Sequence, residues 1–293
     1  MSAPLPLLKG HEKDLGGGFV VRRLLPAAAR RAVGPFIFFD HFGPVQVAPD
    51  STHDVRPHPH IGLATVTYLF EGAIMHRDSL GSAQLIEPGA INWMTAGRGV
   101  VHSERRPEHL RGRSYVNHGL QLWVALPREQ EEVAPTFTHT PAAAIPELQL
   151  GSAAVRVLLG QAWGARSPVA TLSPTLYLDV ALPAGAVLEL PPLAPELAAY
   201  AVQGEMVIDG QPVPAGQMVV LDGGGQRLSS RAGARLVLVG GAPLEAPPHM
   251  WWNFVSSRRE RIAQAAEDWQ AQRLGQVPGE TEFIPLPERP YTP

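Results

Sequence analysis

The fold is decided by residues 64–95, which read ATVTYLFEGAIMHRDSLGSAQLIEPGAINWMT. Short runs of β-branched, aromatic and aliphatic residues alternate there with turns built on glycine, proline and serine. The runs cover residues 64–70, 73–77, 83–86 and 91–95. Strands of this length, separated by turns this short, predict an all-β sandwich or barrel.

The same pattern extends outward along the chain. Further runs cover residues 118–125, 155–159, 176–182, 186–190, 198–202, 217–221 and 235–239. The 29 glycines and 30 prolines fit a protein rich in β-turns. Long helical patterns do not alternate with these runs, so a doubly wound α/β fold is not expected.

The chain divides near its middle. Its 293 residues leave room for two domains, and a Pro/Ala-rich stretch at 127–150 is typical of an interdomain linker. We therefore expect domains at 1–135 and 150–293. The sequence from Tyr68 to Gly89 and that from Tyr200 to Gly216 both read strand, glycine corner, hairpin and Pro/Gly turn, which predicts an internal duplication.

One α-helix is expected near the C-terminus. Ser257 and Glu260 form a capping-box pattern, and Gly275 is a typical C-terminal stop. Between them Ile262, Ala265, Ala266 and Trp269 fall on one helical face. That face predicts a helix packed against the β structure, in the second domain.

Composition excludes several classes of protein. A net charge of −3 argues against a nucleic-acid binder. The absence of cysteine removes disulfides, iron–sulfur clusters and thiol nucleophiles. No apolar run approaches the roughly 20 residues of a membrane span, and no secretory signal is readable. A cytoplasmic protein with neither nucleic-acid nor membrane partners is expected.

The histidines are concentrated in the first domain. Ten of the eleven lie within the first 139 residues, and His58-Pro-His60 and His102-Ser-Glu104 each place two candidate ligands at i, i+2. On a β-strand that spacing puts both side chains on one face, about 6–7 Å apart. Two such strands facing one barrel interior would bring three imidazoles and a carboxylate around a single Fe(II), Mn(II), Ni(II) or Cu(II) ion.

These residues carry a resemblance to a known family. His58-Pro-His60, Tyr68–Gly72, Pro88-Gly89 and Trp93-Met-Thr-Ala-Gly-Arg-Gly99 with His102-Ser-Glu104 resemble the pirins of the cupin superfamily. The upstream segment Gly34–Gly43, GPFIFFDHFG, is similar to the pirin N-terminal segment. The resemblance implies a bicupin, with two jelly-roll β-barrel domains and the C-terminal helix.

The resemblance also implies a metal site. Pirins hold one metal in the N-terminal cupin, here through His58, His60, His102 and Glu104, while the C-terminal cupin lacks a metal. Iron is the expected ion, with Mn, Co, Ni or Cu as alternatives. The broad cupin pattern has a glutamate four residues after the second histidine; this chain has Ala64 there, so the carboxylate is expected from Glu104.

Two functions follow from the resemblance. Several bacterial pirins are similar in activity to quercetin 2,3-dioxygenases, which open flavonols with O2 and release carbon monoxide. Eukaryotic pirins are instead iron-dependent transcription co-regulators, so a non-enzymatic regulator with a protein partner is the alternative. A metal that only stabilises the barrel is a third possibility. The dioxygenase interpretation is preferred, with a flavonol-like aromatic substrate.

In a dioxygenase, Glu104 is the candidate catalytic base for the flavonol 3-hydroxyl, besides being a ligand. An apolar wall for the flat substrate is expected from aromatic residues, for which ordinary core packing is the alternative. They are Phe36, Phe38, Phe39, Phe42 and Trp93.

The remaining candidates have weaker signals. Asp40 and His41 are expected either at the site mouth, behind the ligands, or as turn-capping groups. Arg98 is expected in a turn. Other histidines are expected in solvent or packing roles, and three arginine doublets on solvated faces, with a partner-docking patch as the alternative. They are His53, His76, His109, His118 and His139, and Arg22-Arg23, Arg30-Arg31 and Arg105-Arg106.

Overall fold

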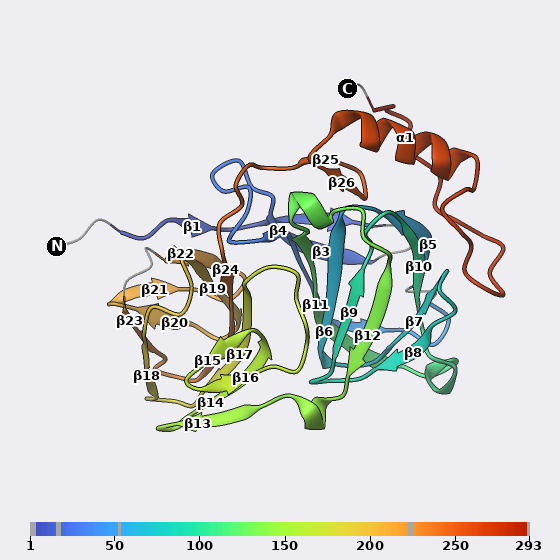
Figure 1. Ribbon diagram of the computed structural model, residues 1–293. Helices are drawn as coiled ribbons and strands as arrows, with labels where there is room; N and C mark the ends of the chain where they lie inside the picture. The colour runs from blue at the N-terminus through green and yellow to red at the C-terminus, as the bar shows by residue number, and fades with distance from the viewer. Residues whose placement is uncertain (1–3, 16–18, 52–53, 222–224, 292–293) are drawn as a thin grey trace. The chain divides into compact units, whose positions relative to one another are not determined.

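The computed structural model describes residues 4–15, 19–51, 54–221 and 225–291. The chain separates into two compact units (Figure 1). Unit 1 comprises Met1–Glu12, Arg22–Phe39 and Ala143–Glu245. Unit 2 comprises Lys13–Val21, Asp40–Ala142 and Ala246–Pro293. Each unit is therefore assembled from three separate segments of the chain, because strand pairing joins segments that are distant in sequence.

Unit 1 is built on a seven-stranded and a four-stranded antiparallel sheet. The larger sheet has the order β1 (Leu7–Leu8), β22 (Met218–Leu221), β19 (Glu196–Gln203), β24 (Ala234–Gly241), β17 (Thr175–Leu182), β14 (Ala153–Leu159) and β13 (Glu147–Leu150). The smaller sheet has the order β18 (Val187–Leu190), β23 (Gln226–Ser229), β20 (Met206–Ile208) and β21 (Gln211–Val213). A two-stranded ribbon of β15 (Gln161–Ala162) and β16 (Ala165–Arg166) completes it.

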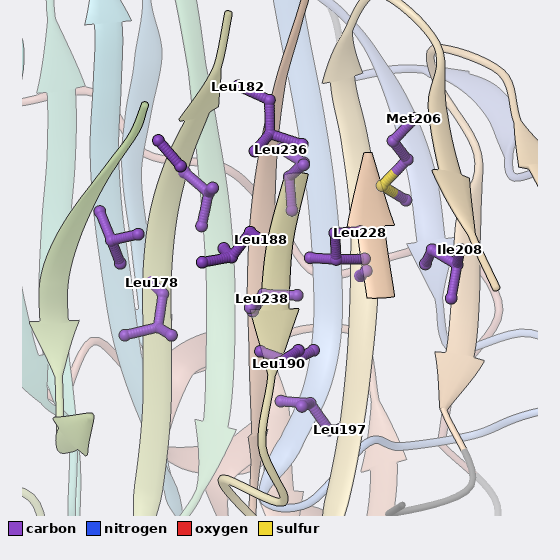
Figure 2. Close-up of a cluster of buried hydrophobic side chains, with 14 of the residues drawn as sticks. Leu178, Leu182, Leu188, Leu190, Leu197, Met206, Ile208, Leu228, Leu236 and Leu238 are labelled. Carbon is purple, nitrogen blue, oxygen red and sulfur yellow. The ribbon is translucent and has the colours of Figure 1, made fainter. Parts of the chain in front are cut away.

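The core of unit 1 lies between these two sheets. Leu178, Leu236 and Leu238 come from the larger sheet, and Leu188 and Leu228 come from the smaller one (Figure 2). All five are buried. Because side chains alternate along a strand, each sheet directs one apolar row inward, and burying these rows stabilises the unit.

Unit 2 is built around a second pair of sheets. One has the order β12 (Thr136–Thr140), β9 (Ile91–Thr95), β6 (Leu63–Glu71), β11 (Tyr115–Ala125), β4 (Phe36–Val47), β3 (Val20–Leu25) and β2 (His11–Asp14). The other has the order β5 (Val55–His60), β10 (Val100–Arg105), β7 (Ile74–Asp78) and β8 (Ala83–Ile86). Strands β2, β3 and β4 each run from one unit into the other. Phe42 and Leu69 from the first sheet pack with Ile74 and Ile86 from the second.

The C-terminal segment belongs to unit 2. A hairpin of β25 (His249–Trp251) and β26 (Phe254–Ser256) precedes α1 (Arg259–Gln270) (Figure 1). Ile262, Ala265 and Trp269 are buried against Ile61 and Val101, which lie at the end of β5 and on β10. The predicted apolar helix face is confirmed. The contacts group the helix with Asp40–Ala142, whereas the sequence-based boundaries place it in the second domain.

The predicted capping box is wrong. The residue before the first turn of α1 is Arg258, and its side chain makes no capping hydrogen bond. Ser257 instead donates from its backbone N–H and from Oγ to the buried carboxylate of Glu131, at 2.8 and 3.0 Å. The helix ends at Gln270, five residues before Gly275. A tertiary partner for the serine outweighs its local capping preference.

The all-β prediction is confirmed. The expected runs coincide with β6–β9, β11, β14, β17–β19, β22 and β24, with ends shifted by up to three residues. The expected linker contains 3₁₀ turns at Arg128–Gln130 and Ala142–Ala144 and the strands β12 and β13, which pair with β9 and β14. A further 3₁₀ turn spans Glu108–Leu110. Within the described residues, no helix is long and apolar enough to cross a bilayer.

Candidate metal centre

The two histidine motifs lie on neighbouring strands. β5 and β10 pair antiparallel, with His58 opposite His102 and His60 opposite Val100. Alternation along each strand puts His58, His60 and His102 on one face. On the other face Val101 packs under α1. The strand interpretation of both motifs is confirmed.

Three imidazoles converge on this face. One ring nitrogen from each of His58, His60 and His102 lies within 4.8 Å of the others. The Nε2 atoms of His60 and His102 are 3.1 Å apart. All three side chains are buried. Among the residues that the structure describes, this is the only cluster of three or more such ligand groups.

The remaining ring nitrogens face hydrogen-bond acceptors. Nδ1 of His58 donates to the Arg56 carbonyl at 2.9 Å, and Nδ1 of His60 donates to the Asn253 carbonyl at 3.3 Å. Because a neutral imidazole carries one proton, these bonds leave Nε2 of both rings as a lone pair. His102 Nδ1 faces Nδ1 of His76 at 3.4 Å.

Burial keeps the rings neutral. Desolvation lowers the pKa of His58 to about 4 and holds the pKa values of His60 and His102 well below their ordinary range. Repulsion between neighbouring imidazolium charges adds to the effect for each ring. Neutral imidazole is the form that binds a metal.

The donor set fits a transition metal. The Nε2 atoms of His60 and His102 lie 3.1 Å apart, so a divalent cation bound by both rings would find two nitrogen ligands already close together. Uncharged nitrogen donors in a cysteine-free site suit iron, manganese, cobalt, nickel or copper. They leave coordination positions for a carboxylate and for substrate.

Glu104 is adjacent to the cluster but not part of it. It follows His102 by two residues on β10 and lies opposite His76 on β7. Its side chain reaches the surface in part, while burial of the carboxyl raises its pKa to about 7. Among the described residues, the group of ligand atoms within 4.8 Å contains the three histidines and no carboxylate. The structure thus brings together three of the four predicted ligands.

His76 is buried and packed, which is one of its two expected roles, and it also contacts the cluster. Its Nε2 lies 3.1 Å from Oδ2 of Asp78, and its ring stacks on Phe137 at 4.2 Å. Its Nδ1 faces His102. His76 and Asp78 are themselves spaced i, i+2 on a strand, the same signal that singled out His58-Pro-His60. Only the placement of β7 beside β10 reveals the connection.

The predicted aromatic residues pack elsewhere. Phe36 and Phe39 contact Tyr177 and Tyr200 inside unit 1, and Phe38 lies under the Arg23 guanidinium in the same unit. Phe42 is in the core of unit 2. Core packing therefore accounts for these phenylalanines.

Trp93 lies on β9, where its indole N–H donates to Thr95 Oγ1 at 3.0 Å. The aromatic ring beside the cluster is Trp123 of β11, 5.1 Å from the His60 ring and edge-on to it. Its position follows from strand order, which the sequence pattern does not reveal.

The other histidines lie outside the cluster. His41 and His118 are buried with their Nε2 atoms 2.8 Å apart, and Asp40 is buried on β4. His139 is half-buried and bonds to Asn92 Oδ1 at 2.7 Å. His109 is exposed. The prediction for His53 falls outside the described residues.

The arginine predictions have mixed outcomes. Arg98 is exposed in a turn, as expected. Arg105 binds Glu280 and Glu282 of the C-terminal tail, and buried Arg106 donates to the carbonyls of Ala48 and Pro49 at 2.6 and 2.7 Å. The Arg105-Arg106 doublet is thus held by intramolecular partners rather than lying on a solvated face.

The two halves match two family descriptions. Residues 18–124 match Pirin, and residues 177–275 match the Pirin C-terminal cupin domain. The chain belongs to the pirin family. This pirin is 47% identical over 285 residues to a pirin-like protein of Caulobacter vibrioides, covering 95% of this chain and 97% of the relative. The bicupin prediction is confirmed, with the histidine cluster in the Pirin-matching half.

Solved structures give the same picture. One crystal structure described as quercetin 2,3-dioxygenase from Acinetobacter baumannii superposes with a TM-score of 0.91 and 34% identity, covering 98% of this pirin and 96% of that chain. A second Acinetobacter baumannii structure with the same description has a TM-score of 0.87 and 25% identity, covering 93% and 98% of the two chains.

Proposed function

We propose that this pirin is a mononuclear metal dioxygenase that cleaves flavonols such as quercetin with O2. His58, His60, His102 and Glu104 would hold the ion, with Fe(II) the expected metal and Mn, Co, Ni or Cu as alternatives. The observation that carries the proposal is the convergence of three buried, neutral imidazoles on one face of β5 and β10. The substrate class rests on the likeness to the Acinetobacter baumannii quercetin 2,3-dioxygenases.

The bound ion, the histidines and two aromatic rings would have different roles in the reaction. A divalent ion at the cluster supplies Lewis acidity toward the flavonol oxygens and the redox chemistry that O2 requires. Neutral His58, His60 and His102 offer lone pairs without adding charge. Trp123 lies edge-on to His60 and Phe137 stacks on His76, so both rings help to exclude water, which strengthens electrostatic interactions inside the site.

Glu104 is the proposed proton acceptor. A flavonol must lose its 3-hydroxyl proton to become electron-rich, and a base works best when its pKa lies near the working pH. In the metal-free protein, burial raises the pKa of Glu104 to about 7; a divalent ion beside it would favour the ionised carboxylate, which is the form that can take the proton on an oxygen. The same carboxylate, once ionised, would complete the ligand set.

Reloading the metal-free protein tests this function. Quercetin consumption in air should appear with at least one of Fe(II), Mn(II), Co(II), Ni(II) and Cu(II), and should stop when O2 is removed. His60→Ala should abolish it because one of three ring ligands is lost. His139→Gln, a half-buried histidine bonded to Asn92, is the matched control and should keep full turnover.

Glu104→Gln separates the two roles of the carboxylate. Loss of the base with metal retained should lower kcat by about 10²- to 10⁴-fold, whereas loss of the metal itself would assign Glu104 mainly to ligation. A fully loaded wild type that consumes no flavonol with any metal would contradict the dioxygenase proposal and favour a metal-dependent regulator that binds a protein partner. The proposed setting is the cytoplasm.

A further inference from the structure

Asp78 and His76 form a buried pair directly behind the cluster of three histidines. In the ladder between β7 and β10, His102 lies opposite Asp78, and Glu104 lies opposite His76. Asp78 is fully buried and His76 nearly so. The two residues therefore occupy the same inward face as the three clustered imidazoles, one strand further along the sheet.

Asp78 is held as an acceptor of hydrogen bonds. Its Oδ1 accepts the backbone N–H groups of Leu80 and Ser82, both at 2.9 Å. Its Oδ2 faces Nε2 of His76 at 3.1 Å. Burial opposes the charge, yet the hydrogen bonds from His76 and Ser82 outweigh it and hold the pKa of Asp78 below its ordinary value. An ionised carboxylate has no proton to donate, so Nε2 of His76 carries the hydrogen of this bond.

The position of the hydrogen on His76 determines which ring nitrogen of His102 carries a proton. When the single ring proton of His76 lies on Nε2, its Nδ1 offers a lone pair, and this Nδ1 lies 3.4 Å from Nδ1 of His102. His102 must then be the donor in that bond. Its single proton resides on Nδ1, which leaves Nε2 as a lone pair facing Nε2 of His60 across 3.1 Å.

We propose that Asp78 and His76 are positioning residues that set the tautomer and orientation of His102, so that its Nε2 is available to the metal. This inference rests on the proposed function for the identity of the site. His58 and His60 obtain the same result from backbone carbonyls. His102 obtains it from the side chains of His76 and Asp78, a carboxylate–imidazole relay that can be altered by substitution.

The relay predicts an effect specific to the amide. In Asp78→Asn the amide oxygen replaces Oδ1, where two backbone N–H groups hold it, and the amide NH2 then faces His76. His76 must accept that bond on Nε2, its proton moves to Nδ1, and His102 becomes protonated on Nε2. The ligand nitrogen of His102 is thereby blocked, although the variant differs from wild type by only an oxygen-to-nitrogen exchange.

Two substitutions at His76 provide the matched comparison. His76→Gln keeps the relay, because its amide nitrogen can donate to Asp78 and its amide oxygen can accept from Nδ1 of His102. His76→Phe keeps a ring to stack on Phe137 and removes both hydrogen bonds. A merely structural role for His76 would favour the phenylalanine, whereas the relay favours the glutamine.

Co(II) affinity, measured by competition with a chromophoric chelator, is the first measurement. Outer hydrogen-bond partners of metal ligands typically contribute about 10- to 100-fold in affinity. Asp78→Asn and His76→Phe should lose that factor and change the visible Co(II) spectrum, while His76→Gln should stay within about threefold of wild type. Equal Co(II) affinity in wild type, Asp78→Asn and His76→Phe would overturn the inference.

Long-range ¹H–¹⁵N spectra of the metal-free protein give a second, independent measurement. They should show His102 protonated on Nδ1 in wild type and in His76→Gln, but on Nε2 in Asp78→Asn. The His102 signals are identified by their loss in His102→Gln. A wild-type His102 protonated on Nε2 would also overturn the inference.

These measurements need no turnover. A protein that shows the tautomer switch but consumes no flavonol would retain the positioning role and lose the proposed reaction. Should Asp78→Asn fail to fold, the comparison of His76→Phe with His76→Gln in Co(II) affinity decides alone.

Discussion

At the scale of single residues, burial shifts the pKa values of the titratable groups in the candidate metal centre away from their ordinary values. Burial keeps the three rings neutral and raises the pKa of Glu104 to about 7. Neither condition favours folding, because each group would be solvated more freely in the unfolded chain. The site therefore costs stability in the metal-free protein, and bound metal would offset that cost.

Acid should destabilise the metal-free protein through His58. The folded pKa is about 4 and the ordinary value is 6.5, so between these values the unfolded chain binds a proton that the folded chain does not. The free energy of unfolding contributed by this group therefore falls as pH falls through that window. Glu104, with a raised pKa, acts in the opposite sense, so the useful quantity is the difference from His58→Gln.

Relative to wild type, His58→Gln should gain about 1.5 kcal/mol between pH 6.5 and pH 5. Urea unfolding of the metal-free proteins across this range measures the gain. His109→Gln, which alters an exposed histidine, should show no comparable trend. A constant difference between His58→Gln and wild type would contradict the burial argument.

At the scale of elements, the β25–β26 hairpin, which comes from the C-terminal part of the chain, positions the proposed metal ligand His60. The hairpin contacts the end of β5, where Phe254 bridges to Ile61 and the Val255 N–H donates to the Ile61 carbonyl at 3.2 Å. This contact brings the Asn253 carbonyl to His60. Gly62 permits the approach, because a Cβ there would lie 1.9 Å from the Val255 carbonyl oxygen.

Gly62→Ala should therefore push the hairpin away from His60. Gly112→Ala is the matched control: both glycines have positive φ, +70° and +67°, but a Cβ at Gly112 meets nothing within 4 Å. Backbone strain alone should cost each variant about 1 kcal/mol or more. Only Gly62→Ala should cost further stability and weaken Co(II) binding, as measured by thermal unfolding and chelator competition. Equal metal affinity in the two variants would show that the hairpin carbonyl is dispensable.

At the scale of the whole molecule, each unit buries an apolar cluster of its own, and the histidine cluster found among the described residues lies in unit 2. A ligand that binds only the folded state stabilises it by mass action, by about 2.7 kcal/mol at one hundred times Kd. Bound metal therefore raises the free energy of local openings that break the site, and it leaves the free energy of openings elsewhere unchanged.

Hydrogen exchange with and without Co(II) should reveal that difference. Amides of β5, β7, β10 and the β25–β26 hairpin should exchange more slowly with metal, and those of β17 and β24 in unit 1 should be unchanged. His60→Ala should remove the effect. Equal protection of both units would indicate that the chain opens as a single cooperative body.

Much of the fold and part of the site could be read from the sequence because the signals are local. Alternation of side chains along a strand is a property of a few consecutive residues, so the strand runs and the ligand spacing of His58-Pro-His60 could be recognised directly. The apolar face of α1 is local in the same sense. The spacing of His102-Ser-Glu104 and the resemblance both predict Glu104 as a ligand; in the structure it lies next to His102 on β10, outside the group of ligand atoms within 4.8 Å.

The rest depended on pairing between distant segments. The sequence alone determined an all-β chain, a histidine-rich first half and two ligand pairs spaced for strands. Only the tertiary structure decided that β7 lies beside β10, so that His76 and Asp78 stand behind His102, and that Asn253 meets His60 from 193 residues away. It also decided that Ser257 bonds to Glu131 instead of capping α1. Such contacts depend on which strands and hairpins pack together, and no local periodicity encodes that choice.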